Sequence, residues 1–359
     1  MKRGLFLLFF VCSLSFLNAQ TVLVDSDEGF PVSYASVLNQ DGKFLGLTSV
    51  DGLLPELNDA QSISITHIAY EPLKVKVKDL KGELKFKPVQ MQLGEAVVAT
   101  PKTYCIRLTG FVRNYVLTNQ LFEDDDPILR FYEGIGDLYI FMKNDKHEWM
   151  EIATRDGKTN QMAKKQKGVR LRLGAKSVVE TINNSEKVSL RDAQGYRQVI
   201  KNDTVIGSLI TDEDDRIIRV DIDHLFPDTV RLFNAVVAKL RITELKENFI
   251  YQMTDEDYVS QSTLKAYNTY DKYWTKLFGQ RFEGNGFTEL YVDKAECLSK
   301  EEYKEAMKQY KQLRKTSYAE ITSEDLDKYI REHNIPGIPD ELLKSLEISR
   351  QIQEKNNKK

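Results

Sequence analysis

The sequence predicts a mainly β protein in three parts: a small N-terminal β-sandwich, then an antiparallel sheet that is curved or forms a partial barrel, then α-helices at the C-terminus. Three observations lead to this prediction. Short segments that alternate apolar and polar residues, separated by turn residues, fill the region from about residue 20 to residue 98. Longer segments of β character, with hairpin turns between them, continue to about residue 298. Helical periodicity follows only after Ser299.

Residues 1–19 have the composition of an export signal rather than of a folded element. Lys2 and Arg3 precede an apolar run that ends at Leu17, and a small residue, Ala19, then offers a cleavage site. The run is shorter than the about 20 residues that a membrane-spanning helix needs, and no later run reaches that length. We therefore expect an exported chain that begins at Gln20 and has no transmembrane segment after the signal is removed.

Charge and cysteine content exclude several classes of protein. Lys plus Arg is 51 and Asp plus Glu is 54, so the basic surplus of a nucleic-acid-binding protein is absent. Three Cys and four His are too few for a zinc framework or a disulfide-dense scaffold. Cys12 lies inside the apolar run of the signal, which favours ordinary cleavage over lipidation. Export would let Cys105 and Cys297 form a disulfide; the alternative is two buried thiols that never meet.

The region 20–100 is predicted to be a sandwich of about six short strands. Asn39–Gly42 and Val50–Gly52 are tight-turn signals between them. Pro101 cannot donate to a strand ladder, so the last strand should end near it and a short linker should follow. We expect this region to fold as a unit by itself. The predicted strands are Thr21–Val24, Val32–Leu38, Leu45–Ser49, Ser62–Ile68, Leu73–Val77 and Phe86–Leu93.

Four segments of this region, taken in order, resemble the carboxypeptidase regulatory-like domain, a prealbumin-like β-sandwich. They are Gly29–Val37, Thr48–Gly52, Ile65–Glu71 and Gln92–Val98. The resemblance covers residues 20–98 only. It departs from the family pattern at Ala69, where Gly is usual before the tyrosine, and at Leu53, where a basic residue is usual.

The resemblance implies interaction or assembly rather than catalysis. In exported proteins of Gram-negative cells this domain often precedes others, including the barrels of TonB-dependent transporters, so we expect the periplasm or the periphery of the outer membrane. The zinc carboxypeptidases that give the domain its name need a His-x-x-Glu pair and a later His. No His in this sequence has a Glu three positions on, and His147–Glu148 lacks the second His of His-Glu-x-x-His. We therefore assign no catalytic, cofactor-binding or metal residues.

The region 101–298 is predicted to be mostly β, of a type that the sequence does not identify. A strictly alternating segment, Val169–Leu173, indicates a half-buried strand. The acidic turn Asp212–Asp215 indicates a hairpin tip. Such a sheet would have a concave face able to shelter an apolar ligand. The other predicted strands are Tyr104–Leu117, Ile128–Met142, and two hairpin pairs, Thr204–Ile210 with Arg216–Ile222 and Leu240–Leu245 with Phe249–Met253.

The region 299–359 is predicted to be helical. Ser299–Glu302 is a capping box, and Thr322–Asp325 begins a second helix. Pro339 is suited to the first turn of a third helix. One face of the first helix carries the apolar and aromatic residues Tyr303, Met307, Tyr310 and Leu313.

Acidic and histidine residues give the candidate sites, each with a simpler interpretation. Glu123–Asp126 contains clustered carboxylates suited to calcium, although a solvated turn is the better interpretation. Asp221 and Asp223 share one strand face next to His224, which suits metal or acid–base chemistry, but a surface strand end explains them as well. His67 shares a face with apolar residues and is expected to be a satisfied core or edge histidine.

Aromatic, glycine and glycosylation patterns give weaker candidates. An aromatic groove is one interpretation of Tyr132, Tyr139, Phe141 and Trp149, and ordinary core packing is the preferred one. Gly134–Gly136 lacks the third glycine of a phosphate loop. Asp203 and Asp228 each begin a loose Asp-Thr-aliphatic pattern for O-glycosylation, of a kind that arises by chance.

From these observations we expect a non-catalytic exported envelope protein with a binding or assembly role, without a cofactor. Its partner would be another envelope protein or an apolar ligand. A periplasmic lipid or lipoprotein carrier that uses the concave face of the second region is one alternative. A hydrolase without a recognisable motif is the other.

Overall fold

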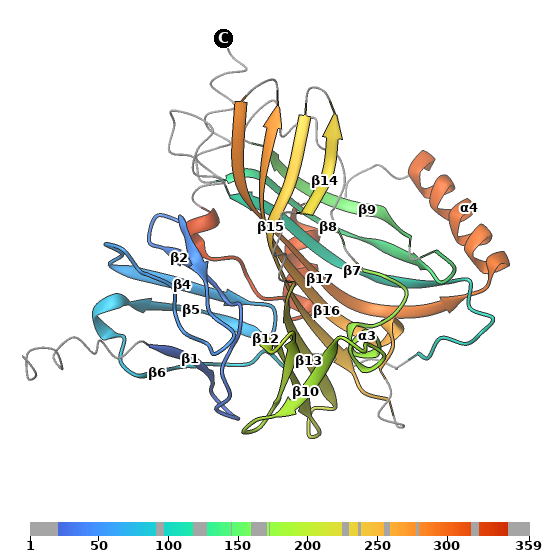
Figure 1. Ribbon diagram of the computed structural model, residues 1–359. Coiled ribbons are helices and arrows are strands. Elements are labelled where there is room, and N and C mark those ends of the chain that lie inside the picture. The colour runs from blue at the N-terminus through green and yellow to red at the C-terminus, as the bar shows by residue number, and fades with distance from the viewer. Residues whose placement is uncertain are drawn as a thin grey trace, which may run out of the picture.

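The computed structural model describes residues 21–90, 97–117, 128–144, 146–158, 171, 173–224, 230–235, 238–254, 259–277, 280–316 and 323–343 (Figure 1). The fold is mainly β, with two small N-terminal sheets, one large antiparallel sheet and helices toward the C-terminus, which confirms the predicted fold class. Among the described residues, no helix is both long and apolar enough to cross a membrane.

The N-terminal unit, residues 21–90, consists of two sheets that enclose an apolar core. The first pairs β1 and β6 in parallel, and the second has the order β3-β2-β4-β5. The predicted turn at Gly52 forms with φ +73°, and an added Cβ would lie 2.4 Å from the carbonyl oxygen of Leu23, so only glycine fits. The strands are β1 Val22–Asp25, β2 Ser36–Asn39, β3 Phe44–Leu47, β4 Ser62–His67, β5 Tyr70–Lys76 and β6 Glu83–Phe86, with a 3₁₀ turn at Val77–Asp79.

Within the described part of the chain the large sheet contains eleven strands, ten of them in one continuous order, β10-β11-β12-β13-β15-β16-β17-β7-β8-β9. The remaining strand, β14, pairs with the part of β15 that β13 leaves free. All its pairings are antiparallel. The order has two edges, so the described strands form an open sheet. The strands are β7 Cys105–Leu117, β8 Ile128–Phe141, β9 His147–Lys158, β10 Val188–Asp192, β11 Arg197–Lys201, β12 Thr204–Asp212, β13 Ile217–Asp223, β14 Val230–Ala235, β15 Ala238–Gln252, β16 Leu264–Leu277 and β17 Gln280–Leu298.

The sheet brings the two ends of the region 101–298 together, because its first strand, β7, pairs with its last, β17. The predicted hairpin around the acidic turn is confirmed as β12 and β13. The second predicted hairpin is wrong: the segments around Leu245 and Phe249 belong to one continuous strand, β15. The polar residues Lys246–Asn248 between them resemble a turn in sequence, but they pair with β13 on one side and β16 on the other.

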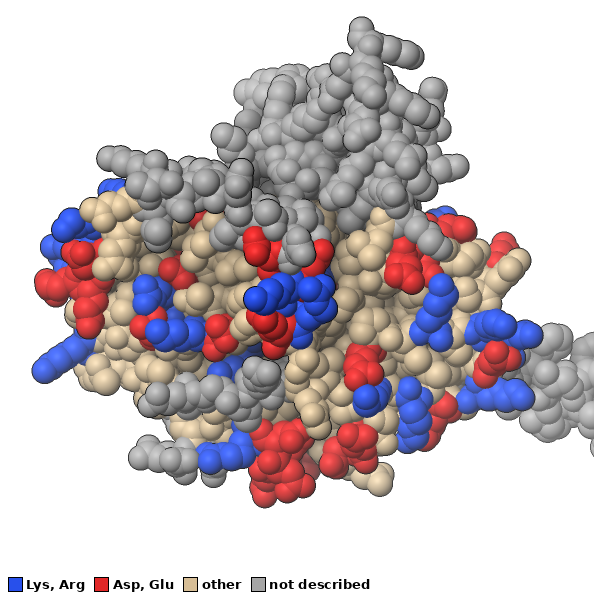
Figure 2. All heavy atoms as spheres, turned by 180° about the vertical axis from the view of Figure 1, so that it is seen from behind, with Lys and Arg blue, Asp and Glu red and all other residues tan. Residues whose placement is uncertain are grey.

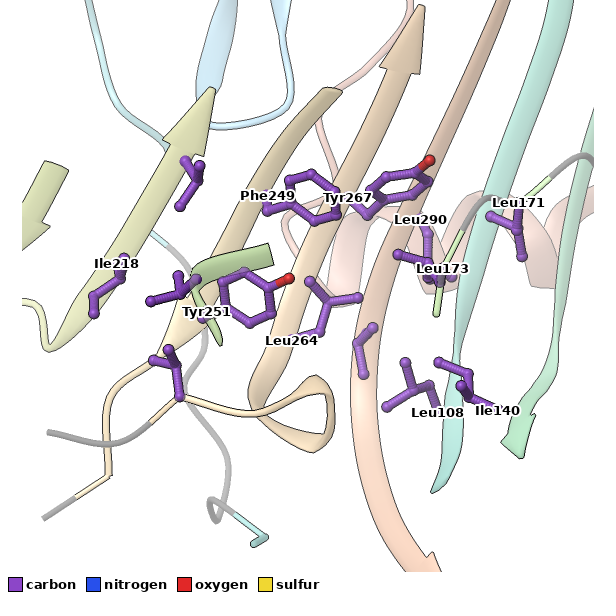
Figure 3. Packing of buried hydrophobic residues seen from close by; sticks show 14 of the residues in the cluster. Leu108, Ile140, Leu171, Leu173, Ile218, Phe249, Tyr251, Leu264, Tyr267 and Leu290 are labelled. Carbon is purple, nitrogen blue, oxygen red and sulfur yellow. The ribbon is translucent and has the colours of Figure 1, made fainter. Parts of the chain in front are cut away.

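One face of the large sheet, which we call the α3 face, packs against the short helix α3, Val178–Asn183, and the segment before it. Leu171 and Leu173 lie in this core, seen in Figure 3 with Leu290 and Ile140 of the sheet. Neither leucine is in a strand, so the strand predicted at Val169–Leu173 is wrong where the structure describes it. The alternation was nevertheless informative, because both leucines are buried.

The opposite face, which we call the junction face, is covered by the N-terminal unit and by C-terminal elements. Ile250 of β15 and Ala266 of β16 belong to the same apolar cluster as the core of the N-terminal unit. Phe44 of β3 packs edge-on against Phe287 of β17, with ring centroids 5.2 Å apart. The N-terminal unit therefore shares its core with the large sheet, and its independent folding stays a prediction.

The C-terminal helices begin as the sequence indicated. The capping box at Ser299 forms: its backbone N–H donates to Glu302 Oε2 at 2.7 Å, and its hydroxyl accepts from the Glu302 backbone N–H at 3.3 Å. Tyr303 and Met307 then pack on a cluster around Tyr139. The helices are α4 Lys300–Thr316 and α5 Ser323–Glu332, and residues 340–343 form a further helical turn.

Candidate functional site

A row of polar side chains crosses the junction face of the large sheet. Each member lies directly opposite the next in the strand register, so all project from the same face. Most are nearly inaccessible to solvent. We call these residues the polar row; they are Ser208, Asp221, Asn248, Asn268, Glu289, Arg113 and Glu133.

The polar row fixes how the strands pair. A slip of one residue between two strands would turn the slipped strand's polar side chains toward the α3 face, whose core is apolar. Hydrogen bonds join the members: the Asn248 amide donates to Asp221 Oδ1 at 2.9 Å, and the Asn268 amide donates to Asn248 Oδ1 at 3.0 Å. The polar groups are thus paired with each other although they are buried.

At one end of the row, Arg113 is held by three acceptors. Its Nε donates to Glu133 Oε1 at 2.8 Å, and its Nη1 donates to Glu289 Oε2 at 2.8 Å and to the carbonyl of Pro336 at 3.0 Å. Burial raises the pKa of the Glu289 carboxyl above its usual value, although Arg113 opposes this shift. The guanidinium therefore joins three strands and ties the segment after α5 to the sheet.

At the other end, Arg219 of β13 meets the N-terminal unit. Its Nη1 donates to the hydroxyl of Tyr70, which itself donates to Asp25 Oδ2 at 2.7 Å. Its Nε lies 3.4 Å from Asp221 Oδ2, and its guanidinium carbon lies 4.8 Å from the ring centre of Phe30. Arg219 is only 5% exposed. Among the described residues, its Nε and Nη2 have no hydrogen-bond partner.

His67 of the N-terminal unit lies above the same part of the row. Its Nδ1 accepts from the Ala69 backbone N–H at 3.1 Å, so its proton is on Nε2, 3.9 Å from Asp221 Oδ1. Burial, and then the charge of Arg219, lower the pKa of His67 well below its usual value. The histidine is buried as predicted but not fully satisfied, because Nε2 has no hydrogen-bond partner within the described chain.

A hollow of about 360 Å³ opens beside Arg219, between the N-terminal unit and the β12–β13 hairpin. Its apolar wall comes from both sides of the junction: Phe30, Val89, Ile210, Ile217 and Ile250. Its acidic residues also come from both sides: Asp25, Asp27, Glu28, Asp212, Asp214 and Asp215. We call it the acidic hollow. Acidic side chains gather at the lower edge of the molecule in Figure 2, the end at which Figure 1 shows the β12–β13 hairpin.

The acidic residues of the hollow differ in what holds them. Asp25 is buried, and its Oδ1 accepts from the backbone N–H groups of Asp27 and Glu28 at 2.8 and 3.0 Å. Asp212 accepts from the backbone N–H of Asp215 at 2.8 Å, which shapes the hairpin turn. The predicted tip thus forms and also lines the hollow.

Tyr70 and Arg219, which meet beside the hollow, are held in their protonated states. Burial raises the pKa of the Tyr70 phenol above its usual value. Burial opposes the charge of Arg219, but Tyr70 and Asp221 still raise its pKa. Neither group can therefore act as a base near neutral pH. Asp25 already accepts from Tyr70 and two backbone N–H groups, so the arrangement suits binding and structural support better than acid–base chemistry.

Asp221 and Asp223 share a strand face, as the sequence predicted, but their surroundings differ. Asp221 is fully buried in the polar row, so the interpretation as a surface strand end is wrong for it. The cause is the N-terminal unit, which covers this end of β13. Asp223 pairs with Lys246 at 3.6 Å, and His224 Nε2 lies 2.7 Å from Glu247 Oε2. Among the described residues, no group of three or more metal-binding side chains is present.

The aromatic candidates do not share one groove. Tyr132 and Trp149 belong to the α3-face core, where the Trp149 indole donates to the Tyr132 hydroxyl at 3.2 Å. Tyr139 and Phe141 lie on the other face, under Tyr303 of α4. They are core residues on two sides of the sheet.

Three of the remaining candidates lie in the described part of the chain, and two lie outside it. His147 begins β9, and Gly134–Gly136 lies within β8 rather than in a loop. Asp203 is in the exposed turn between β11 and β12. Glu123–Asp126 and Asp228 lie outside the described residues.

The register keeps the two candidate disulfide cysteines apart. Cys105 lies opposite Leu298 and Cys297 opposite Ile106, so the two side chains point to opposite faces of the sheet. Both are free thiols in the structure. Burial raises the pKa of Cys105 to about 11. The proposed bridge would require β7 and β17 to shift by one residue.

Comparison with known proteins adds no relative: no protein-family model matches the chain, and no curated protein matches it.

Proposed function

We propose that this is a non-catalytic exported protein of the cell envelope that binds a partner at the junction between its N-terminal unit and its large sheet. The observation that carries this proposal is the acidic hollow, to which both parts contribute side chains around a buried arginine. The resemblance to the carboxypeptidase regulatory-like domain, and with it a place in the periplasm or at the outer-membrane periphery, belongs to the same proposal.

The construction of the junction supports a binding role. Two contacts hold the N-terminal unit in place: Arg219 of the sheet with Tyr70, beside the hollow, and Glu341 of the C-terminal segment with Ser64 at 3.0 Å. A site whose walls are fixed in this way loses little conformational entropy when a partner binds.

The two alternatives receive less support. A hydrolase needs a group that can accept a proton near neutral pH, and of the buried polar groups that line the hollow, Tyr70 and Arg219 are held protonated and Asp25 is already hydrogen-bonded. A lipid carrier needs an apolar hollow on the curved sheet. The described part of the α3 face is instead filled by side chains of the chain itself, including Leu171, Leu173 and Val179.

Site-specific photo-crosslinking tests the proposal. A photoreactive amino acid placed at Asp214, beside the hollow, should give a discrete crosslinked product in the native envelope. The same amino acid at Glu301, on the exposed side of α4, serves as the control position. Equal crosslinking from both positions, or none from position 214, would contradict a partner-binding role for this junction.

A further inference from the structure

We propose that the acidic hollow receives a lysine- or arginine-containing segment of a partner protein: a main-chain carbonyl accepts from Arg219, and the basic side chain lies among the carboxylates of the two acidic turns. This inference rests on the proposed binding function and names the chemistry of the ligand. Two independent features support it: a buried donor of Arg219, at the base of the hollow, that has no acceptor among the described residues, and the excess of carboxylates around it.

The unfilled donor is Nη2 of Arg219. The side chain lines the hollow and is 5% exposed. Its Nη1 donates to Tyr70, whereas Nε lies 3.4 Å from Asp221 Oδ2 and, like Nη2, has no hydrogen-bond partner in the described chain. A buried donor without an acceptor is costly, and the described chain supplies no acceptor to Nη2. An acceptor oxygen from a ligand would satisfy it.

The negative charge around Arg219 determines which kind of acceptor group can approach it. The described residues that line the hollow carry six carboxyl groups and one guanidinium, and no lysine or histidine is among them. A carboxylate or phosphate reaching for Arg219 would pass the exposed side chains of Asp27, Glu28, Asp214 and Asp215. Repulsion from these groups disfavours an anion, whereas a neutral amide carbonyl is not repelled.

The same exposed carboxylates favour a cation at the mouth. Asp27 and Glu28 follow β1, and Asp214 and Asp215 form the tip between β12 and β13, so negative charge lies on both sides of the opening. The apolar wall between them, which includes Ile217 and Phe30, suits the aliphatic stem of lysine or arginine. A peptide offers both the carbonyl and the cation, and the volume of about 360 Å³ has room for a side chain and its backbone.

Binding of a defined peptide to the full mature chain tests this inference. The probe is tetralysine, acetylated at its N-terminus and amidated at its C-terminus, titrated by calorimetry or fluorescence anisotropy. We expect binding at low salt that weakens as salt is added, because exposed charges are screened. Equally blocked tetraglutamate should not bind. Spermine, which has positive charges but no carbonyl, should bind at least several-fold more weakly.

Two double variants with the same change in charge locate the site. Asp214→Asn with Asp215→Asn removes two exposed carboxylates from the mouth and keeps the Asp215 backbone N–H that Asp212 holds. Glu301→Gln with Glu305→Gln removes two exposed carboxylates from α4 and serves as the matched control. We expect the first pair to weaken tetralysine binding about tenfold and the second to leave it nearly unchanged.

Arg219→Lys tests whether the guanidinium at the base of the hollow binds the carbonyl of the peptide. It keeps the positive charge but removes the planar group that reaches both Tyr70 and the hollow, so tetralysine should bind more weakly while its advantage over spermine disappears. A variant that fails to fold is recognised by its circular dichroism, and the mouth variants then decide the question.

The outcomes separate the ligand from the function. No binding of tetralysine, equal binding by the two double variants, or equal affinity for spermine would each overturn this inference. If crosslinking from position 214 still gives a specific product in those cases, the proposed function stands and the ligand class is wrong.

Discussion

Arg113 and Arg219 lie on the same face of the same sheet and are both buried, 2% and 5% exposed, yet they are held in different ways. Arg113 donates to two carboxylates and a backbone carbonyl, all supplied by the chain. Arg219 donates to one tyrosine hydroxyl, and its Nε and Nη2 have no acceptor among the described residues.

This difference separates structural support from binding. A buried guanidinium with all its contacts inside the chain locks elements together, as Arg113 does for three strands and the segment at Pro336. A buried guanidinium with a free donor beside a hollow is incomplete without a further group. The junction face thus has a closed end and an open end, joined by the polar row.

Replacing Arg113 should cause the largest loss in the free energy of unfolding. Arg113→Met breaks the buried ion pairs that the guanidinium makes with Glu133 and Glu289, and breaking a buried ion pair in this way costs about 3–5 kcal/mol. Urea unfolding followed by circular dichroism measures the loss. Adding Glu289→Gln to Arg113→Met removes a buried carboxylate that has lost its cation and should restore part of the stability. A double variant no more stable than the single one would argue against this account.

Replacing Arg219 should lower the free energy of unfolding by a smaller amount. Arg219→Met also breaks an ion pair, with Asp221, but that pair is 3.4 Å long and not hydrogen-bonded. Tyr70 still donates to Asp25 and Asp221 still accepts from Asn248 at 2.9 Å, so we expect a loss of about 1–3 kcal/mol in the same assay. The variant should also lose tetralysine binding, whereas any Arg113 variant that folds should keep it. If Arg219→Met proves as destabilising as Arg113→Met, both arginines are structural and the contrast fails.

Local patterns in the sequence were sufficient for the elements whose signals lie within a few residues. The capping box at Ser299 and the hairpin tip at Asp212–Asp215 are examples, because both depend on neighbouring residues alone. The continuous strand β15 was missed since Lys246–Asn248 look like a turn until strands on both sides are in place.

The candidate site depended on contacts that no local pattern contains. Arg219 was not singled out, because an arginine that alternates with apolar residues is usually on the surface. Only the N-terminal unit, nearly 150 residues earlier in the chain, buries it through Tyr70. The one usable signal was the alternation at Asp221 and Asp223. It predicted that polar groups share one face of β13, but it did not indicate that the N-terminal unit covers that face.

The open end should also respond to pH through His67. Its pKa is lowered in the folded protein, so below the unfolded value of about 6.5 the unfolded chain binds a proton that the folded chain does not. Stability is therefore retained above that value and declines as pH falls toward the folded pKa, by up to about 1.4 kcal/mol per pH unit.

Replacing His67 should make the loss of stability at falling pH less steep. Urea unfolding of His67→Gln between pH 7.5 and pH 5 should show a shallower loss than the unmodified protein, because glutamine does not titrate. His333→Gln, which alters a partly exposed histidine 3.5 Å from Asp293, serves as the control. Identical pH slopes for His67→Gln and the unmodified protein would mean that His67 can be protonated where it lies.

The smallest effect is expected at the two cysteines, which report on the separation of the sheet's faces. Cys105 is on the junction face and Cys297 on the α3 face. We expect mature protein prepared without reductant to yield two thiols per chain on maleimide labelling after unfolding, and its melting temperature to stay unchanged on adding reductant. A native disulfide would require β7 and β17 to pair one residue out of the observed register. That shift would also move Arg113 away from Glu289, so the bridge and the closed end of the polar row exclude each other.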